Sequence, residues 1–342
     1  MIPIAASALM WLLVASLLIL RRGRADRSIM YSAVTIAVAM TFNVDTTYRW
    51  ADAVLGGTNI VTLLADLTLM VGVFFLGRGV AKAMQYQSRV AQIALGLPVL
   101  AGAVVGAVTA FAFIDRGETT TTFMLDLGAQ PAAATYSIIQ FTYDGVVLTA
   151  MAAAASRQIG RSRGAERLPA VSVLVGSLTG VTLSLVVIAM DLAHIIGNLT
   201  LMDGLSAAYD PLFLATFLFL CLGLGAQPAL RWARARSRGE KTRALLAQVT
   251  PTWERAIDVR PGLSQLEPSF HREDDETRLH RQIVEVRDAV IDPRVTFTLS
   301  DAERVAVESA EAHLMTGDVA RSPDADARPA DVPDVGRPKE AH

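Results

Sequence analysis

The chain has 342 residues, of which 52% are hydrophobic, and a formal net charge of −2 at pH 7. A soluble domain with this apolar fraction would be unusual, so the composition indicates several long uncharged segments. The single cysteine, Cys221, excludes an intramolecular disulfide, a CxxC redox motif and a cysteine-based metal cluster.

Seven apolar runs predict membrane spans. They cover residues 2–20, 29–44, 59–77, 90–113, 132–155, 168–196 and 208–226. A helix of about 20 apolar residues matches the roughly 30 Å hydrocarbon core of a bilayer. The sequence therefore predicts an all-α fold with a polytopic bundle of seven transmembrane helices. The expected partner of this part of the chain is the lipid bilayer.

Proline and glycine add weaker expectations about helix shape and packing. Pro98 predicts a bend in the fourth helix. Gly102 and Gly106, and also Gly176 and Gly180, have the GxxxG spacing that lets helices approach closely. The alternative is that these glycines only reflect a composition rich in small residues.

Basic residues are distributed unequally between the two sets of connections. Alternate connections, with residues 227–243 after the last run, contain 17 lysines and arginines, whereas the opposite connections contain only Arg49 and Arg116. The positive-inside rule places the basic set in the cytoplasm. The first run has its basic cluster after it and none before it, which favours an anchor over a cleaved signal peptide. We therefore expect a multi-pass protein of the cell membrane with its N-terminus outside and its C-terminus in the cytoplasm.

The chain beyond residue 227 has the pattern of a small cytoplasmic helical domain. Residues 228–256 predict a basic and then amphipathic helical region, interrupted at the pair Thr250 and Pro251, and residues 259–273 predict a linker. Residues 274–290 have the clearest helical spacing of apolar residues outside the predicted spans. These apolar positions are Leu279, Ile283, Val286 and Val290.

The end of the chain predicts one more helix and a tail. Ser300 and Glu303 form a capping box that opens a helix to about Leu314. From residue 316 the chain has little apolar content and is expected to be disordered. The predicted domains are therefore residues 1–227, 228–315 and 316–342.

Residues 277–290, TRLHRQIVEVRDAV, resemble a group of actinobacterial seven-helix integral membrane proteins that carry the label of transporter. These proteins join a seven-helix membrane part to a C-terminal cytoplasmic domain of unknown function. The stretch 245–257, LLAQVTPTWERAI, and the helix 302–314 fit the same pattern, whereas residues 292–299 depart from it. The resemblance implies a transporter, without a substrate and without assigned functional residues.

Asp144 is the only charged residue in the run 132–155, and it shares one helical face with Tyr136, Gln140 and Tyr143. A carboxylate within a bilayer costs roughly 2.5–3.5 kcal/mol on insertion scales, so it needs a partner, a water path or a proton. No lysine or arginine accompanies it within the runs. We expect the three neighbours to donate hydrogen bonds to Asp144.

Other polar residues are expected to complete an acidic cup open to the outside. In the third run, Asp66 follows Asn59 on one face, and Asn43 and Asp45 end the second run. The candidate site for a cation or polar solute consists of Asp144, Asp66, Gln140, Tyr143, Tyr136, Asp191 and His194. The alternative for Asp45, Asp191 and Asn198 is a solvated position among lipid headgroups, whereas the greater depth of Asp144 and Asp66 favours function.

Several classes of chemistry lack the residues that they need. A zinc site usually needs three or four protein ligands, and Asp191 with His194 supplies two. A retinal Schiff base needs a lysine in the seventh run, and residues 208–226 contain none. Phosphate loops, HExxH motifs and nucleophile elbows are also missing from the sequence. We therefore expect no metal, no cofactor and no enzymatic activity.

Three function classes remain from the sequence, and a membrane-embedded enzyme ranks last because no nucleophile or metal set is found. The first is a transporter that takes an unknown cation or polar small molecule from outside. The alternative is a membrane receptor that reports to a cytoplasmic protein partner through the helical domain. Nucleic acid is not an expected partner. A water path from Asp144 to the cytoplasmic side would favour transport, and a dry inner half would favour sensing.

Overall fold

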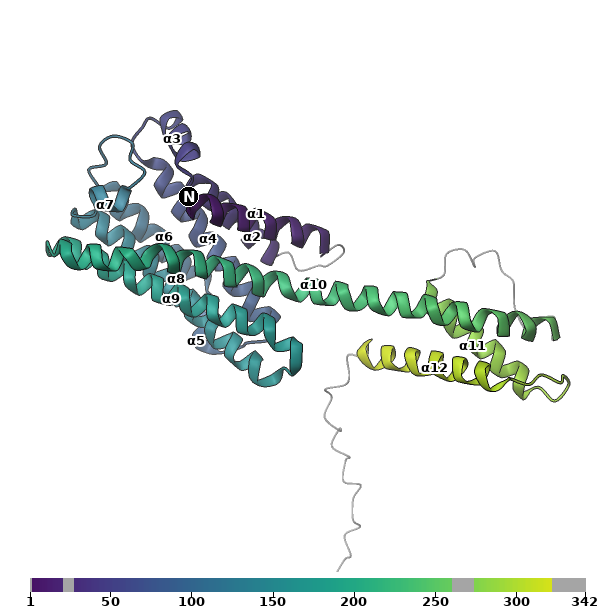
Figure 1. Cartoon of the computed structure of the whole chain (residues 1–342). Helices are drawn as coiled ribbons and strands as arrows, with labels where there is room; N and C mark the ends of the chain where they lie inside the picture. Colours follow the sequence, from purple (N-terminus) through teal and green to yellow (C-terminus); the bar gives the residue numbers. More distant parts are fainter. Residues whose placement is uncertain (1, 21–27, 260–273, 322–342) are drawn as a thin grey trace, which may run out of the picture. The chain divides into compact units, whose positions relative to one another are not determined.

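A computed structural model describes residues 2–20, 28–259 and 274–321, which form helices joined by turns and loops, with no strand among them (Figure 1). The predicted linker 259–273 lies almost wholly outside them. The chain divides into two compact units, Met1–Trp232 and Ala233–His342. The predicted boundary after residue 227 falls in the same helix, α10 (Leu199–Val259), which contributes to both units.

Five helices of the first unit are long and apolar enough to cross a membrane. They are α1 (Ile2–Leu20), α4 (Ile60–Ala83), α8 (Pro131–Arg161), α9 (Arg167–Ile195) and α10. The second predicted run forms α2 (Ser28–Phe42), which is followed by α3 (Asp45–Val54) after a bend of 83°. Counting this bent pair as one span gives six.

The fourth predicted run is broken instead of bent. It forms the short α5 (Arg89–Ala94) and then α6 (Leu97–Ala112), whose 16 residues extend only about 24 Å. Pro98 is in the first turn of α6, where a missing N–H costs no hydrogen bond. The expectation of a continuous helix with a bend at Pro98 is therefore wrong, because the proline starts a new helix.

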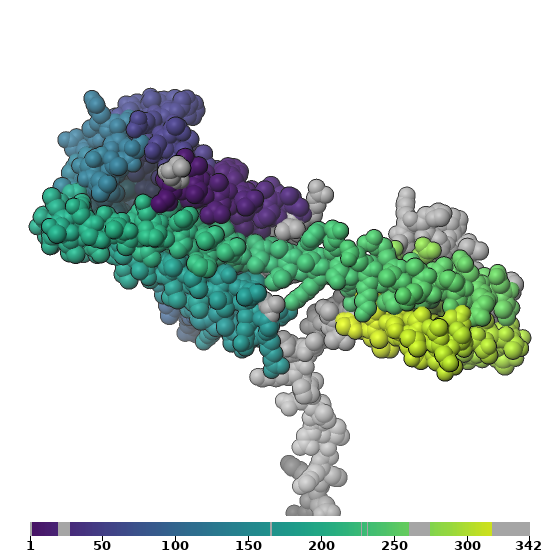
Figure 2. Space-filling model, in the orientation of Figure 1, coloured from purple at the N-terminus to yellow at the C-terminus, as the bar shows by residue number. Residues whose placement is uncertain are grey.

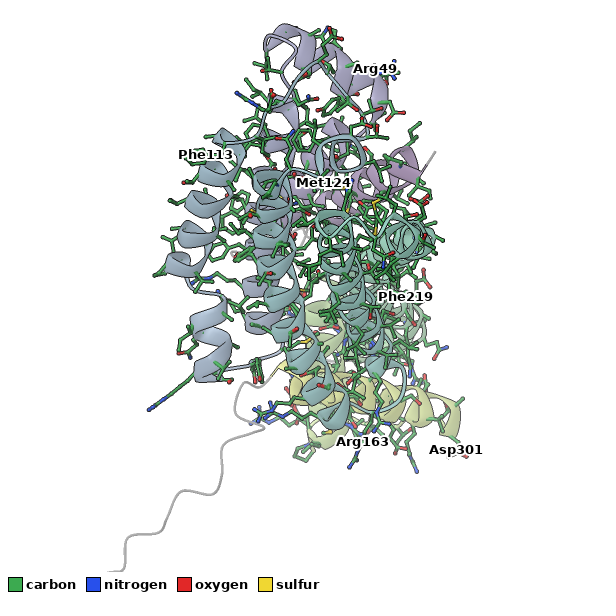
Figure 3. All side chains as sticks on the ribbon, turned by 90° about the vertical axis from the view of Figure 1, so that its left-hand side faces the viewer. Arg49, Phe113, Met124, Arg163, Phe219 and Asp301 are labelled. Carbon is green, nitrogen blue, oxygen red and sulfur yellow. The ribbon has the colours of Figure 1, made fainter. Side chains whose placement is uncertain are left out.

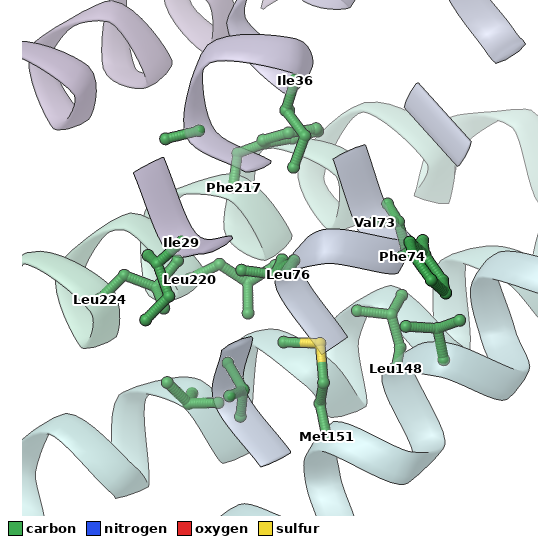
Figure 4. Packing of buried hydrophobic residues seen from close by; sticks show 14 of the residues in the cluster. Ile29, Ile36, Val73, Phe74, Leu76, Leu148, Met151, Phe217, Leu220 and Leu224 are labelled. Atoms are coloured by element: carbon green, nitrogen blue, oxygen red, sulfur yellow. The ribbon is translucent and has the colours of Figure 1, made fainter. Parts of the chain in front are cut away.

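Small residues allow the helices of the first unit to pack closely. An added Cβ at Gly72 or Gly79 of α4 would meet Ile36 or Ile29 of α2 at 2.5 and 2.7 Å. The apolar core formed around these contacts includes side chains from α2, α4, α8 and α10 (Figure 4). On one face of the unit, α1 and α10 lie side by side (Figure 2), where Cys221 Sγ is 3.5 Å from Met10 Sδ.

The two GxxxG pairs have different outcomes. A Cβ at Gly176 would lie 2.8 Å from Leu220 N of α10, and one at Gly180 would lie 2.7 Å from Leu148 Cδ1 of α8. Gly102 has open space around its Cβ position, and Gly106 faces only Ile139. The pair on α9 is therefore a packing site, and the pair on α6 is not.

The first unit has two distinct ends (Figure 3). Arg49 of α3 lies at one end, which also contains α7 (Phe123–Leu127), and Arg163 lies at the other, where α5 is found. These are called the α3–α7 end and the α5 end below. The 3₁₀ turn Gly164–Glu166 connects α8 to α9 at the α5 end.

The second unit packs the last part of α10 against α11 (Asp275–Ile291) and α12 (Asp301–Arg321). Leu279, Ile283 and Val286 are buried as predicted, whereas Val290 is 40% exposed and Ala289 takes the buried position. The capping box is confirmed, because Ser300 N donates to Glu303 Oε2 at 2.8 Å. The last helix continues past Leu314 to Arg321, and the rest of the predicted tail, residues 322–342, lies outside the described residues.

The predicted interruption at Pro251 does not occur, since α10 is one helix of 61 residues. Leu245, Val249, Thr252 and Ala256 are all buried at helical spacing on both sides of the proline. Tertiary packing of this continuous stripe against α11 and α12 therefore outweighs the lost backbone hydrogen bond.

Candidate functional site

The centre of the candidate site is a hydrogen bond between two membrane helices. Tyr136 of α8 donates to Asp66 Oδ2 of α4 at 2.6 Å. Tyr136 is 2% exposed, and the Gln140 amide, one helical turn further along α8, faces the same carboxylate. The helical spacing of Tyr136 and Gln140 thus brings two hydrogen-bonding groups to Asp66.

Asp144 lies one turn beyond Gln140 and is 7% exposed. Its Oδ1 is buried and has no hydrogen-bond partner among the described residues. The Asp66 carboxylate is near enough to interact with it electrostatically. Over the described part of the chain, neither carboxylate forms an ion pair with lysine or arginine. A buried carboxylate without a countercharge calls for a proton or a cation.

The predicted hydrogen bonds to Asp144 are not formed. Tyr136 precedes Asp144 by eight residues, which is about 12 Å along a helix, so its hydroxyl reaches across to α4 instead. Tyr143 Oη is buried and unpartnered among the described residues. Tyr136, Gln140, Tyr143 and Asp144 are therefore all buried along α8, as a shared face predicts. The shared face did not show which carboxylate each of the other three side chains contacts.

Asp191 and His194 belong to a second group on α9. Asp191 is 5% exposed and lies beside Ser137 of α8, although its Oδ2 has no hydrogen bond of standard geometry within the described residues. Next to Asp144, the Cβ position of Gly145 is 3.3 Å from Ser184 Cβ. Asp191 is seven residues beyond Ser184, or about 10 Å along the helix. The structure thus places Asp191 about 10 Å closer to the α3–α7 end than the level of Asp144.

His194 packs against the turn between α7 and α8. Its Nδ1 lies 2.8 Å from the Cβ position that a side chain at Gly128 would occupy. Within the described ranges, no group of three or more histidine, cysteine, aspartate or glutamate residues has an arrangement that could hold a metal ion.

Asn59, predicted to line the cup, is the centre of a structural network. Its Nδ2 donates to Arg116 O and Glu118 O at 2.8 and 2.9 Å. Its Oδ1 accepts from Tyr48 Oη and Thr120 N at 2.9 and 2.8 Å. All four hydrogen-bonding positions of the amide are therefore used, and none is left for a ligand.

The other outer polar residues also have local structural roles or face solvent. Asn43 Nδ2 donates to Ala39 O of its own helix at 3.1 Å. Asn198 Oδ1 accepts from Leu201 N at 3.1 Å, at the start of α10. Asp45, in the first turn of α3, is exposed.

Asp52 of α3 was missed by the sequence analysis. It is fully buried and accepts hydrogen bonds from Asn59 N at 2.9 Å, Thr119 Oγ1 at 2.7 Å and Val61 N at 3.3 Å. It therefore joins α3, the loop before α7 and the first turn of α4. It lies in the connection between two predicted runs, where only the nearby glycine pair Gly56 and Gly57 signals a tight turn.

On the α5 side of Asp144, the buried side chains of α8 are apolar. Val147 and Met151 are 0% and 1% exposed, and both belong to the main core with Leu76 of α4 (Figure 4). Leu95, at the break between α5 and α6, contacts the same layer. Its Cδ2 and Val147 Cγ1 each lie 2.6 Å from the Cβ position of Gly77. This apolar layer separates the Asp66 and Asp144 pair from the α5 end along α8.

Comparison with protein-family models, with curated proteins and with solved structures found no match to this chain.

Proposed function

We propose that this chain is a seven-span membrane transporter that binds a proton or a small cation at Asp144 and Asp66. The observation that carries the proposal is the buried Asp144 carboxylate, whose Oδ1 has no hydrogen-bond partner among the described residues and which interacts electrostatically with the partly buried Asp66. Neither carboxylate has a basic ion-pair partner among the described residues. Ionisable groups within membrane spans commonly mark ion or proton paths. The resemblance to proteins that carry the label of transporter agrees with this proposal.

The span count combines the five long helices with two shorter candidates. The α2–α3 pair supplies one span and α6, with α5 before it, supplies the other. The 17-to-2 distribution of basic residues then supports an outer α3–α7 end and a cytoplasmic α5 end. A reporter fused after Leu314 is expected to be active only in the cytoplasm, and one inserted at residues 118–127 only outside. Exchanged activities would reverse the orientation.

The apolar layer on the cytoplasmic side of Asp144 would have to open for an ion to cross the membrane. Part of this layer is Leu95, which lies at a helix break and not within a continuous helix. Non-helical backbone in a membrane protein is tolerated where it is enclosed by protein, and transporter sites often lie at discontinuous helices. We infer that movement at this break opens the path from Asp144.

The test is ion flux into liposomes that contain the purified protein and a pH-sensitive dye. With a membrane potential applied, the wild-type protein is expected to conduct protons or to change internal pH through exchange with sodium or potassium. Asp144→Asn removes the ionisable group at nearly constant shape and should abolish the flux. Asp45→Asn, which changes an exposed aspartate, is the matched control and should retain it. Equal flux for the wild-type protein and Asp144→Asn would refute the site.

A receptor is the second candidate, and the same apolar layer favours it. Val147 and Met151 leave the cytoplasmic side of Asp144 closely packed, as expected when a site only senses an outside ion. A receptor predicts ion binding that depends on Asp144 without measurable flux. The flux assay therefore separates the two functions, provided that binding is measured on the same protein preparation.

A further inference from the structure

A groove runs along the surface of the first unit between α5, α8 and α9. It has a volume of about 390 Å³. Apolar side chains from all three helices line it, among them Val90, Ala94, Val146, Ala153, Leu185 and Ile188. Its lining includes Gly145 but neither Asp144 nor Asp66. It is therefore a separate candidate binding site.

Four side chains with hydroxyl groups line the groove, Tyr86, Thr142, Thr149 and Ser184, and two of these hydroxyls are already used within their own helices. Thr149 Oγ1 donates to Gly145 O at 2.7 Å, and Ser184 Oγ donates to Gly180 O at 3.0 Å. Both hydroxyl protons are thus directed to the backbone of their own helices. Val90 and Ile93 of α5 are 76% and 68% exposed, which is typical of a lipid-facing surface. An apolar chain is the chemistry that fits such a wall.

The length of the groove matches one leaflet of a bilayer. Its lining on α8 extends from Phe141 to Ala153, a rise of twelve residue steps and so about 18 Å. Half of a hydrocarbon core of roughly 30 Å is about 15 Å. One acyl chain that starts from the leaflet at the α5 end would therefore occupy the groove along its length.

Arginine side chains lie at the α5 end of the groove. Arg157 is one turn beyond Ala153, and its Cζ lies 5.3 Å from the ring centroid of Tyr86, which lines the groove. Arg89 directly precedes Val90. Both arginines are exposed, and neither forms an ion pair with any residue that the structure describes. Guanidinium groups bind phosphate well, and basic side chains at a membrane surface attract anionic lipids.

We propose that this groove binds one acyl chain of an anionic phospholipid, whose headgroup phosphate lies at Arg157 and Arg89. The site rests on the proposed membrane placement of the chain but not on any role of Asp144. The charge at one end of the groove favours an anionic phospholipid over a zwitterionic one. It also favours a lipid over an apolar surface of a second copy of this chain, which would leave both arginines unneutralised.

The test is native mass spectrometry of the full-length protein released from nanodiscs of phosphatidylglycerol or of phosphatidylcholine. Wild-type protein should retain one phosphatidylglycerol and clearly less phosphatidylcholine. Arg157→Gln should reduce the retained phosphatidylglycerol about fivefold, the effect of about one basic residue at a membrane surface. Arg161→Gln, one turn further along α8 and away from the groove lining, is the matched control and should change it little.

A second pair of variants fills the groove without changing charge. Ala153→Phe should exclude the acyl chain, and Ala153→Leu serves the same purpose if the larger side chain prevents folding. Asp144→Asn should bind the lipid as the wild-type protein does, which separates this site from the proposed ion site. Three results would overturn the proposal. They are unchanged lipid retention in a folded Ala153 variant, equal effects of the Arg157 and Arg161 substitutions, and equal retention of phosphatidylglycerol and phosphatidylcholine. The proposal would also fail if the wild-type protein formed a dimer that the Ala153 variants alone disrupt, because a second copy of the chain would then occupy the groove.

Discussion

Tyr136 of α8 donates a 2.6 Å hydrogen bond to Asp66 of α4, and so joins two candidate membrane spans through a carboxylate. Interhelical hydrogen bonds in membrane proteins contribute about 0.6 kcal/mol on average and up to about 1.7 kcal/mol. We expect a double-mutant cycle of Tyr136→Phe and Asp66→Asn to give a coupling energy within this range. The measurement is thermal or denaturant unfolding in detergent. Strictly additive effects would show that the hydrogen bond does not stabilise the fold.

The Asn59 network predicts a large effect from a small substitution. Asn59 has a φ of 60°, which glycine adopts without strain, so Asn59→Gly keeps the backbone and removes four side-chain hydrogen bonds. At about 0.5–1.5 kcal/mol for each bond, we expect a loss of about 2–6 kcal/mol in unfolding free energy. Gln85→Gly, at an exposed residue with a φ of 52°, is the control and should change stability by less than about 1 kcal/mol.

The glycines of the two GxxxG pairs predict opposite results for the same substitution. Gly176→Ala places a Cβ 2.8 Å from Leu220 N and should destabilise the protein by about 1–3 kcal/mol, since α9 and α10 must separate. Gly102→Ala meets no atom within 4 Å and should be neutral or stabilising by up to about 1 kcal/mol. Comparison of the two melting temperatures in one detergent checks this. A larger loss for Gly102→Ala would contradict the packing.

His313 of α12 predicts a pH dependence of the second unit. Its Nε2 lies 2.9 Å from Thr242 Oγ1, and burial, followed by the charges of Arg238 and Lys241, lowers the pKa of His313 against the opposing effect of Glu276. The unfolded chain then binds more protons, so stability rises with pH. This contribution is complete above the ordinary histidine pKa of about 6.5 and is lost as pH falls through the lower folded value.

The pH dependence can be measured from the protection of a cysteine at the buried position 310. In an Ala310→Cys, Cys221→Ser background, the denaturant concentration that exposes the thiol should fall as pH is lowered through this range. His313→Gln should remove that part of the dependence, whereas His280→Gln, at an exposed residue, should retain it. A dependence that survives in His313→Gln would assign it to other groups.

The sequence predicted the helices better than the contacts between them. Apolar run length identified α1, α4, α8, α9 and α10 because hydropathy is a local property. The break before Pro98 and the continuity through Pro251 depend on which side chains are buried, and run length does not contain that information. Glu285 shows the same limit, since glutamate on a short charged helix is usually exposed, yet it is buried and accepts a hydrogen bond from Trp253 Nε1.

The candidate site was predictable in part for a similar reason. Asp144 and Asp66 stood out because a charge in an apolar run is rare. The partner of Tyr136 could not be predicted, because hydrogen bonds across helices depend on the relative height and rotation of α4 and α8. Asp52 and the Asn59 network could not be predicted either, since they form between segments more than 50 residues apart.

The most direct measurement of the central claim is infrared difference spectroscopy of the purified protein as external pH and the concentrations of sodium and potassium are varied. We predict that the infrared band of a carboxyl group responds to pH or to cation concentration in the wild-type protein and in Asp45→Asn. This band should be missing from Asp144→Asn, which should be at least as stable because a buried ionisable group is removed. A band that persists in Asp144→Asn, or a clear loss of stability in that variant, would contradict the account and make Asp144 a structural residue.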